Sequence, residues 1–208
     1  MKKVLVLLIC LLLVGCEANV NKTNNEEIDK TKEEINDKNN EEINNNDITK
    51  FKEEYEALND KSVKMEVNEN AKLHYLDIDG AIDFLKNKTG ILYFGFPTCP
   101  WCRNILPVLF NVSIDNNEEI YYFNPKELRE TNDEKFNKIM EILDKYLKSN
   151  SNGEKTLYVP DVYFVKDGNI KGHHLSSVES QTNPYETLND SQKQELYNIY
   201  NNLLSEIK

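Results

Sequence analysis

The chain has 208 residues and a formal net charge of −11. Such a strongly acidic balance argues against a nucleic-acid ligand and against electrostatic docking on anionic lipid. The two ends of the chain differ sharply in composition, so one average does not describe both.

The N-terminal segment has the features of an export signal. Two lysines precede an unbroken apolar run from Val4 to Val14, which has the length of a signal-peptide core and is too short to span a bilayer. The run ends in LVGC, residues 13–16, which looks like the lipobox of bacterial lipoproteins. We therefore expect residues 1–15 to be a lipoprotein signal peptide. Cys16 would carry a lipid that holds the protein on the extracytoplasmic face of a bacterial cell membrane. An ordinary signal peptide that contains a cysteine is the alternative.

Residues 16–50 are expected to form the lipidated cysteine and a disordered linker. The 34 residues from Glu17 to Lys50 include ten Asn and ten acidic residues, and they contain no Pro, Gly, aromatic residue or Cys. Such a composition cannot bury enough apolar surface to offset the entropy lost on folding. A loose recurrence of EEI at Ile28, Ile35 and Ile43 leaves a coiled coil as the less favoured alternative.

Apolar periodicity begins at Phe51, and we assign residues 51–208 to one domain. Its first half begins with a short helical face at Phe51, Tyr55 and Leu58. An extended segment over 73–76, a helix over 77–86 and a buried strand over 91–96 are predicted next. A helix after residue 102 then runs through Leu109 and is interrupted by Pro107.

The second half continues the alternation of strands and helices. A buried strand is predicted over 120–123, followed by a helix with an apolar stripe from Phe136 to Leu147. Thr131 and Glu134 are in the positions of a capping box for that helix. Two strands, 162–165 and 169–173, are joined at Asp167-Gly168, a strong hairpin signal. A last helix has an apolar face that ends at Ile207, so the order is β-α-β-α-β-β-α.

Two cysteines separated by two residues follow the strand over 91–96. Cys10 would leave with the signal peptide and Cys16 would bear lipid, so Cys99 and Cys102 are the remaining thiols. At the start of a helix, Cys99 would face unpaired backbone N–H groups and the positive end of the helix dipole, which favour its thiolate. Pro100 suits the first helical turn. Cys102, one turn on, could then resolve a mixed disulfide formed at Cys99.

Two other interpretations of this pair are less favoured. A zinc site needs four ligands, and beyond the two thiols the chain offers only His74, His173 and His174, of which the last two are adjacent and lack the usual ligand spacing. An inert structural disulfide would close a very small loop and would constrain the unfolded chain little. We therefore expect a redox-active pair with no metal and no other cofactor.

The sequence FGFPTCPWCRNILPVL resembles the active-site segment of the thioredoxin superfamily, with Pro107 as the proline that kinks the active-site helix. The sequence YVPDVYFVKDG resembles the segment in which a cis-proline faces the cysteines, which would make that residue Pro160, preceded by Val159. The chain is more narrowly similar to the thioredoxin-like proteins related to bacteriocin transport accessory proteins, to which SVESQTNP adds weakly. The resemblance implies an α/β thioredoxin-like fold with a central mixed sheet flanked by helices.

The chain departs from the family pattern at two positions. Tyr93 stands where thioredoxins have a buried acid that moves protons to and from the second thiol, so proton transfer would need water or another group. Trp101 lies between the cysteines, where it is as well suited to a substrate-facing surface as to the core. His173 and His174 are expected to be strand-end residues, with a role in proton transfer as the alternative.

The resemblance implies a membrane-anchored thiol–disulfide oxidoreductase that acts on exported proteins or peptides. Cys99 would be the nucleophile, Cys102 the resolving thiol, and the substrate would lie extended along Val159 and Pro160, next to Trp101. We expect a monomer that is recycled by a redox partner in the membrane. The alternative function is a non-catalytic accessory lipoprotein of a peptide export system, in which the fold is a docking surface.

Overall fold

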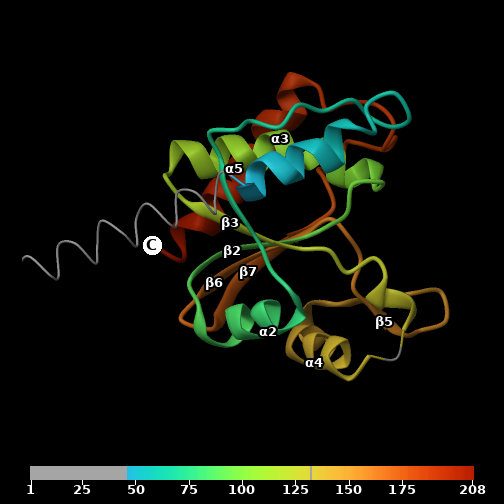
Figure 1. Ribbon diagram of the computed structural model, residues 1–208, viewed down its shortest axis with the longest axis vertical. Helices are drawn as coiled ribbons and strands as arrows, with labels where there is room; N and C mark the ends of the chain where they lie inside the picture. Colours follow the sequence, from blue (N-terminus) through green and yellow to red (C-terminus); the bar gives the residue numbers. More distant parts are fainter. Residues whose placement is uncertain (1–45, 132) are drawn as a thin grey trace, which may run out of the picture. The chain divides into compact units, whose positions relative to one another are not determined.

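A five-stranded mixed sheet forms the centre of the computed structural model (Figure 1). Its strand order is β1-β3-β2-β6-β7, with β1 paired to β3 and β3 to β2 in parallel, and β2 to β6 and β6 to β7 antiparallel. The strands are β1 (Lys72–Tyr75), β2 (Gly90–Phe94), β3 (Glu119–Phe123), β6 (Asp161–Lys166) and β7 (Asn169–Leu175). The Asp167-Gly168 hairpin between β6 and β7 is confirmed.

The structure describes residues 46–131 and 133–208. The predicted signal peptide, the lipidation site at Cys16 and the linker as far as residue 45 lie outside these residues. Within the described part of the chain, no helix is long and apolar enough to cross a membrane.

Helices cover both faces of the sheet (Figure 1). One face packs against α3 (Pro100–Asp115), α5 (Asp190–Ser205) and a helix over residues 46–56, and the other packs against α2 (Ile78–Asn87) and α4 (Glu134–Leu143). Strand β2 is buried along its whole length, since alternate side chains fill the two cores: Ile91 and Tyr93 face α3, whereas Leu92 and Phe94 face α2 and α4. The α/β class with a central mixed sheet flanked by helices is confirmed, and the arrangement is compatible with a thioredoxin-like fold.

The prediction that the linker is disordered as far as Lys50 is wrong for residues 46–50. Residues 46–56 are helical, and Ile48, Phe51 and Tyr55 are each no more than 3% exposed. These residues lie at helical spacing and pack on the sheet, so tertiary burial outweighs the local polar composition. The folded domain therefore begins before residue 51.

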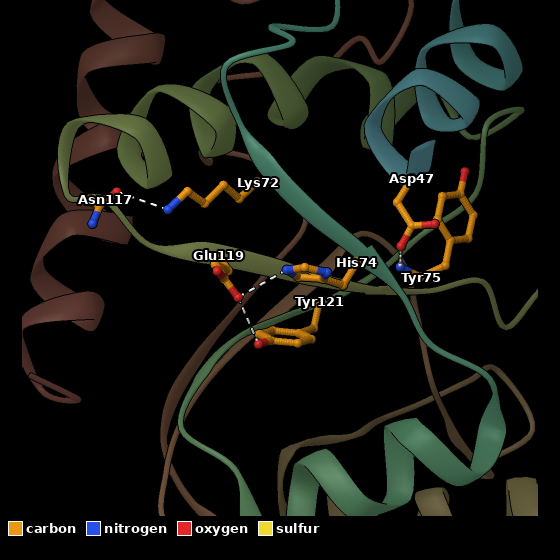
Figure 2. A network of polar contacts seen from close by, with 7 residues as sticks. All are labelled: Asp47, Lys72, His74, Tyr75, Asn117, Glu119 and Tyr121. Carbon is orange, nitrogen blue, oxygen red and sulfur yellow. Dashed lines mark hydrogen bonds and ion pairs between the residues drawn. The ribbon is translucent and has the colours of Figure 1, made fainter. Parts of the chain in front are cut away.

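This helix also covers the edge of the sheet at β1 (Figure 2). The Asp47 carboxylate accepts a hydrogen bond from the backbone N–H of Tyr75 at 3.0 Å. Farther along β1, the imidazole of His74 lies 3.0 Å from the Glu119 carboxylate and stacks on Tyr121. The Asp47 carboxylate thus occupies a backbone donor at the end of the edge strand, which leaves one fewer group for pairing with another chain.

Two local predictions are corrected in the second half of the fold. The cap of α4 is Asp133, whose carboxylate accepts from the N–H of Phe136 at 2.8 Å, and the Thr131 hydroxyl instead donates to the carbonyl of Leu128. Pro107 does not interrupt its helix, because α3 continues through it to Asp115 with buried residues in the turns on both sides. Packing of both turns compensates for the missing backbone hydrogen bond.

Candidate active site

Cys99 caps the N-terminus of α3. Its backbone is extended, with φ −81° and ψ 115°, and its sulfur accepts a hydrogen bond from the backbone N–H of Cys102 at 3.2 Å. Pro100 is the first residue of the helix, where its missing N–H leaves no unsatisfied intrahelical bond. The local sequence thus places one sulfur at the end of the helix where backbone N–H groups have no other partner.

The two thiols, both free, have opposite electrostatic environments. The pKa of Cys99 is lowered from its ordinary value of 9.0 mainly by a hydrogen bond from the Cys102 side chain, with the backbone N–H groups of Cys102 and Trp101 and the charge of Arg129 assisting against the effect of burial. The pKa of Cys102, which is fully buried, is raised well above that value by burial and by its interaction with Cys99. Cys99 is therefore the thiol that loses its proton at the lower pH.

The segment around Pro160 lies against Cys99. The Val159–Pro160 bond is cis, as the sequence predicted, and the carbonyl oxygen of Val159 lies 3.8 Å from the Cys99 sulfur. Trp101 is partly buried and packs with Val159 against the core that contains both cysteines. The structure thus brings together Cys99, Cys102, Trp101 and the Val159–Pro160 segment from positions 60 residues apart in the sequence.

Buried tyrosines lie behind Cys102. The hydroxyl oxygens of Tyr93 and Tyr55 are 3.4 Å apart, and the Tyr55 hydroxyl donates to Tyr122 at 3.5 Å. The Tyr93 hydroxyl also acts on Cys102 as a hydrogen-bond donor that opposes the rise of the thiol's pKa. A side chain at Gly95 would collide with this tyrosine, since an added Cβ would lie 1.9 Å from the Tyr93 hydroxyl oxygen.

Arg103, which the sequence analysis did not single out, holds the loops around the site. Its guanidinium is fully buried and donates to the carbonyls of Val63 at 2.5 Å, Tyr55 at 2.7 Å and Pro97 at 3.2 Å, and to the Asn59 side chain at 2.6 Å. The signal available in the sequence was a charged residue directly after Cys102, at the start of an otherwise apolar helix. A charged side chain that is buried with such a helix needs hydrogen-bond acceptors in the core.

The histidines are not gathered at the cysteines. His173 contacts the buried Asp161 carboxylate at 2.8 Å and stacks on Tyr163, whose side chain belongs to the core on the α2 and α4 face. His174 packs edge-on against Tyr200, and burial lowers its pKa. No contact in residues 46–131 and 133–208 joins either ring to a thiol. Among these residues, no group of three or more His, Cys, Asp and Glu side chains is placed to hold a metal ion.

No known protein family matches the sequence, and no curated protein matches it either. The resemblance to the thioredoxin superfamily therefore depends on the two motifs and on the compatibility of the fold.

Proposed function

We propose that the protein is a thiol–disulfide oxidoreductase in which Cys99 attacks and Cys102 resolves. The observation that carries the proposal is the opposite environment of the two thiols: Cys99 caps a helix and has a lowered pKa, whereas Cys102 is buried and has a raised pKa. A pair with a purely structural role would need no such asymmetry. The placement of the Val159 carbonyl next to the Cys99 sulfur supports the same function.

The exchange would proceed in two balanced steps. The Cys99 thiolate attacks one sulfur of a substrate disulfide, and a mixed disulfide forms while the other substrate sulfur leaves as a thiolate. Cys102 then loses its proton and attacks Cys99, and the second substrate thiolate is released. The substrate gains two electrons, and the pair becomes a disulfide. The reverse sequence would oxidise a substrate dithiol, and no metal or organic cofactor enters either direction.

The substrate in this proposal is an extended segment of an exported protein or peptide. It would lie along Val159 and Pro160, where Val159 is only partly buried, with Trp101 beside the reacting sulfurs. The proposal also keeps the lipid anchor at Cys16, the extracytoplasmic membrane location and a membrane redox partner that recycles the pair. These parts follow from the sequence alone.

Trapping with single-cysteine variants tests the proposal. In the full chain, Cys102→Ser should accumulate a mixed disulfide through Cys99 with a disulfide-containing peptide, and Cys99→Ser should capture none. Capture through Cys102 in the Cys99→Ser variant would reverse the two roles. No capture by either variant, with folding verified by circular dichroism, would refute the enzyme and favour a docking module.

A further inference from the structure

A pocket of about 430 Å³ lies where the segment after β2 meets the segments after β3 and before β6. It is lined by Phe96, Leu157 and other apolar side chains, together with three cations, Lys126, Arg129 and Lys155. We call it the basic pocket. Its lining includes no carboxylate, although the chain as a whole has a net charge of −11. A concentration of positive charge in so acidic a protein points to an anionic ligand.

Three observations place the basic pocket near Cys99. The carbonyl of Phe96 accepts the backbone N–H of Cys99 at 3.1 Å. Leu157 is two residues before Val159, whose carbonyl faces the same thiol. Arg129 is close enough for its charge to act on Cys99. A ligand group in this pocket would therefore belong to a molecule that also reaches the cysteine pair.

Two of the three cations are available to a ligand. Lys155 lies 3.6 Å from the Asp144 carboxylate and donates to the Asp144 carbonyl, so it is already engaged. Lys126 sits over the ring of Phe96, with its nitrogen 5.7 Å from the ring centre. Neither Lys126 nor Arg129 forms a side-chain hydrogen bond or ion pair with another described residue. An arginine and a lysine above apolar walls suit a carboxylate on a short aliphatic stem.

We propose that the basic pocket binds an acidic side chain of the polypeptide substrate, close in sequence to the substrate's disulfide. The inference rests on the proposed function and adds a substrate class to it: cystine-containing polypeptides with Glu or Asp near a cysteine. The carboxylate would pair with Arg129 and Lys126 while the substrate backbone lies along Val159. The pocket thereby selects among exported disulfides and also orients the disulfide for attack by Cys99.

The test compares matched disulfide peptides that differ only by Glu or Gln at one of the three positions on either side of the cysteine. Mixed-disulfide formation is timed with the full-chain Cys102→Ser variant. The best acidic peptide should react about threefold to tenfold faster than its Gln counterpart at low salt, as expected for one or two partly exposed ion pairs. The preference should shrink as the ionic strength rises.

The same peptide pairs are then run with Lys126→Gln and Arg129→Gln combined, in the Cys102→Ser background. Because the loss of Arg129 also raises the pKa of Cys99, only the ratio of rates within each variant is compared, so that thiol reactivity cancels. The ratio should fall to about one. Lys86→Gln and Lys171→Gln combined are the matched control, since these exposed residues of α2 and β7 are outside the pocket and their loss changes the net charge equally. This control should leave the preference intact.

A binding measurement tests the inference independently of disulfide exchange. Peptides with Ser in place of Cys are titrated against the full chain, with the fluorescence of Trp101, the single tryptophan, as the signal. Tighter binding of the Glu peptide, lost in the double variant, supports the pocket. Equal binding and equal rates for Glu and Gln peptides would overturn it, as would a preference that survives in the double variant. Exchange with neither peptide would instead refute the proposed function, and the binding result would still decide on the pocket.

Discussion

Replacing Arg103 by Met should destabilise the domain strongly. Arg103 is the residue after Cys102, and its buried bonds to the carbonyls of Val63 and Tyr55 join α3 to segments that precede β1. A methionine has similar length and no hydrogen-bond donor, so the variant fills the space but leaves these acceptors without the guanidinium. Neither of these buried bonds can be replaced by bulk water without opening the packing around Tyr55.

The magnitude follows from the number of buried acceptors. Each buried acceptor left without its donor costs about 1–3 kcal/mol, so the two carbonyls together cost about 2–6 kcal/mol. Removal of the buried charge returns part of its desolvation energy, so we expect a loss in the lower part of this range, about 2–4 kcal/mol. For a domain of this size such a loss lowers the melting temperature by roughly 4–16 °C.

Urea unfolding of the full chain is the assay, followed by far-ultraviolet circular dichroism and by the fluorescence of Trp101. The transition midpoint should fall while its slope stays constant, since the same surface is exposed on unfolding. Arg129→Met is a matched control, because this is the only other arginine and it is only partly buried. Its effect on the free energy of unfolding should stay within about 0.5 kcal/mol.

Arg103→Lys distinguishes the charge from the geometry of the guanidinium. A lysine keeps the positive charge but cannot reproduce the planar set of donors that reaches acceptors in several segments. Its stability should fall between those of the wild type and the methionine variant. A loss below about 1 kcal/mol in Arg103→Met, or an equal loss in the Arg129 control, would show that Arg103 does not join these segments.

Further outcomes follow from the site. At pH 6, iodoacetamide should label Cys99 and leave Cys102 unmodified in the folded protein, because a lowered pKa leaves more thiolate below the ordinary value of 9.0 and a raised pKa leaves less; equal labelling would contradict the assignment. Tyr93→Phe should slow the resolution of a trapped mixed disulfide without slowing its formation, as measured by stopped-flow quench. Gly95→Ala should cost about 1–3 kcal/mol in urea unfolding through overpacking against the tyrosine. Asp133→Ala should cost about 1 kcal/mol through loss of the α4 cap, and an unchanged midpoint would show that the cap is dispensable.

Elements with a strong local pattern could be predicted from the sequence. The buried strand before the cysteines, the Asp167-Gly168 hairpin and the C-terminal helix each depend on spacing within a few residues, and all three are present. The juxtaposition of Cys99 with Pro160 was also predicted, but through the family resemblance. Nothing in the local pattern would have paired two segments so distant in the chain.

Features that depend on distant partners could not be predicted. The start of the N-terminal helix was missed because residues 46–50 are polar except for Ile48, whose burial depends on the sheet. Arg103 was overlooked because three of its four acceptors lie 40 or more residues away. Lys126 and Arg129 follow β3 in a polar stretch without a motif, and only the folded chain brings them into one pocket with Phe96. In each case the stabilising contacts join residues that are distant in the sequence, so no local sequence pattern indicates them.

The burial of Cys102 behind Cys99 also has a consequence for the oxidation of the two thiols by peroxide. Oxidants act on thiolates, so we expect Cys99, which has the lowered pKa and is 6% exposed, to be converted before the fully buried Cys102, to a sulfenic acid with hydroxide as the leaving group. Cys102, one helical turn away, is shielded from the oxidant but placed to displace water from that sulfenic acid and close the disulfide. Condensation with this sheltered thiol competes with the second, irreversible oxidation to the sulfinic acid. Cys102 would thus protect Cys99 from irreversible oxidation, and reduction of the disulfide would restore both thiols.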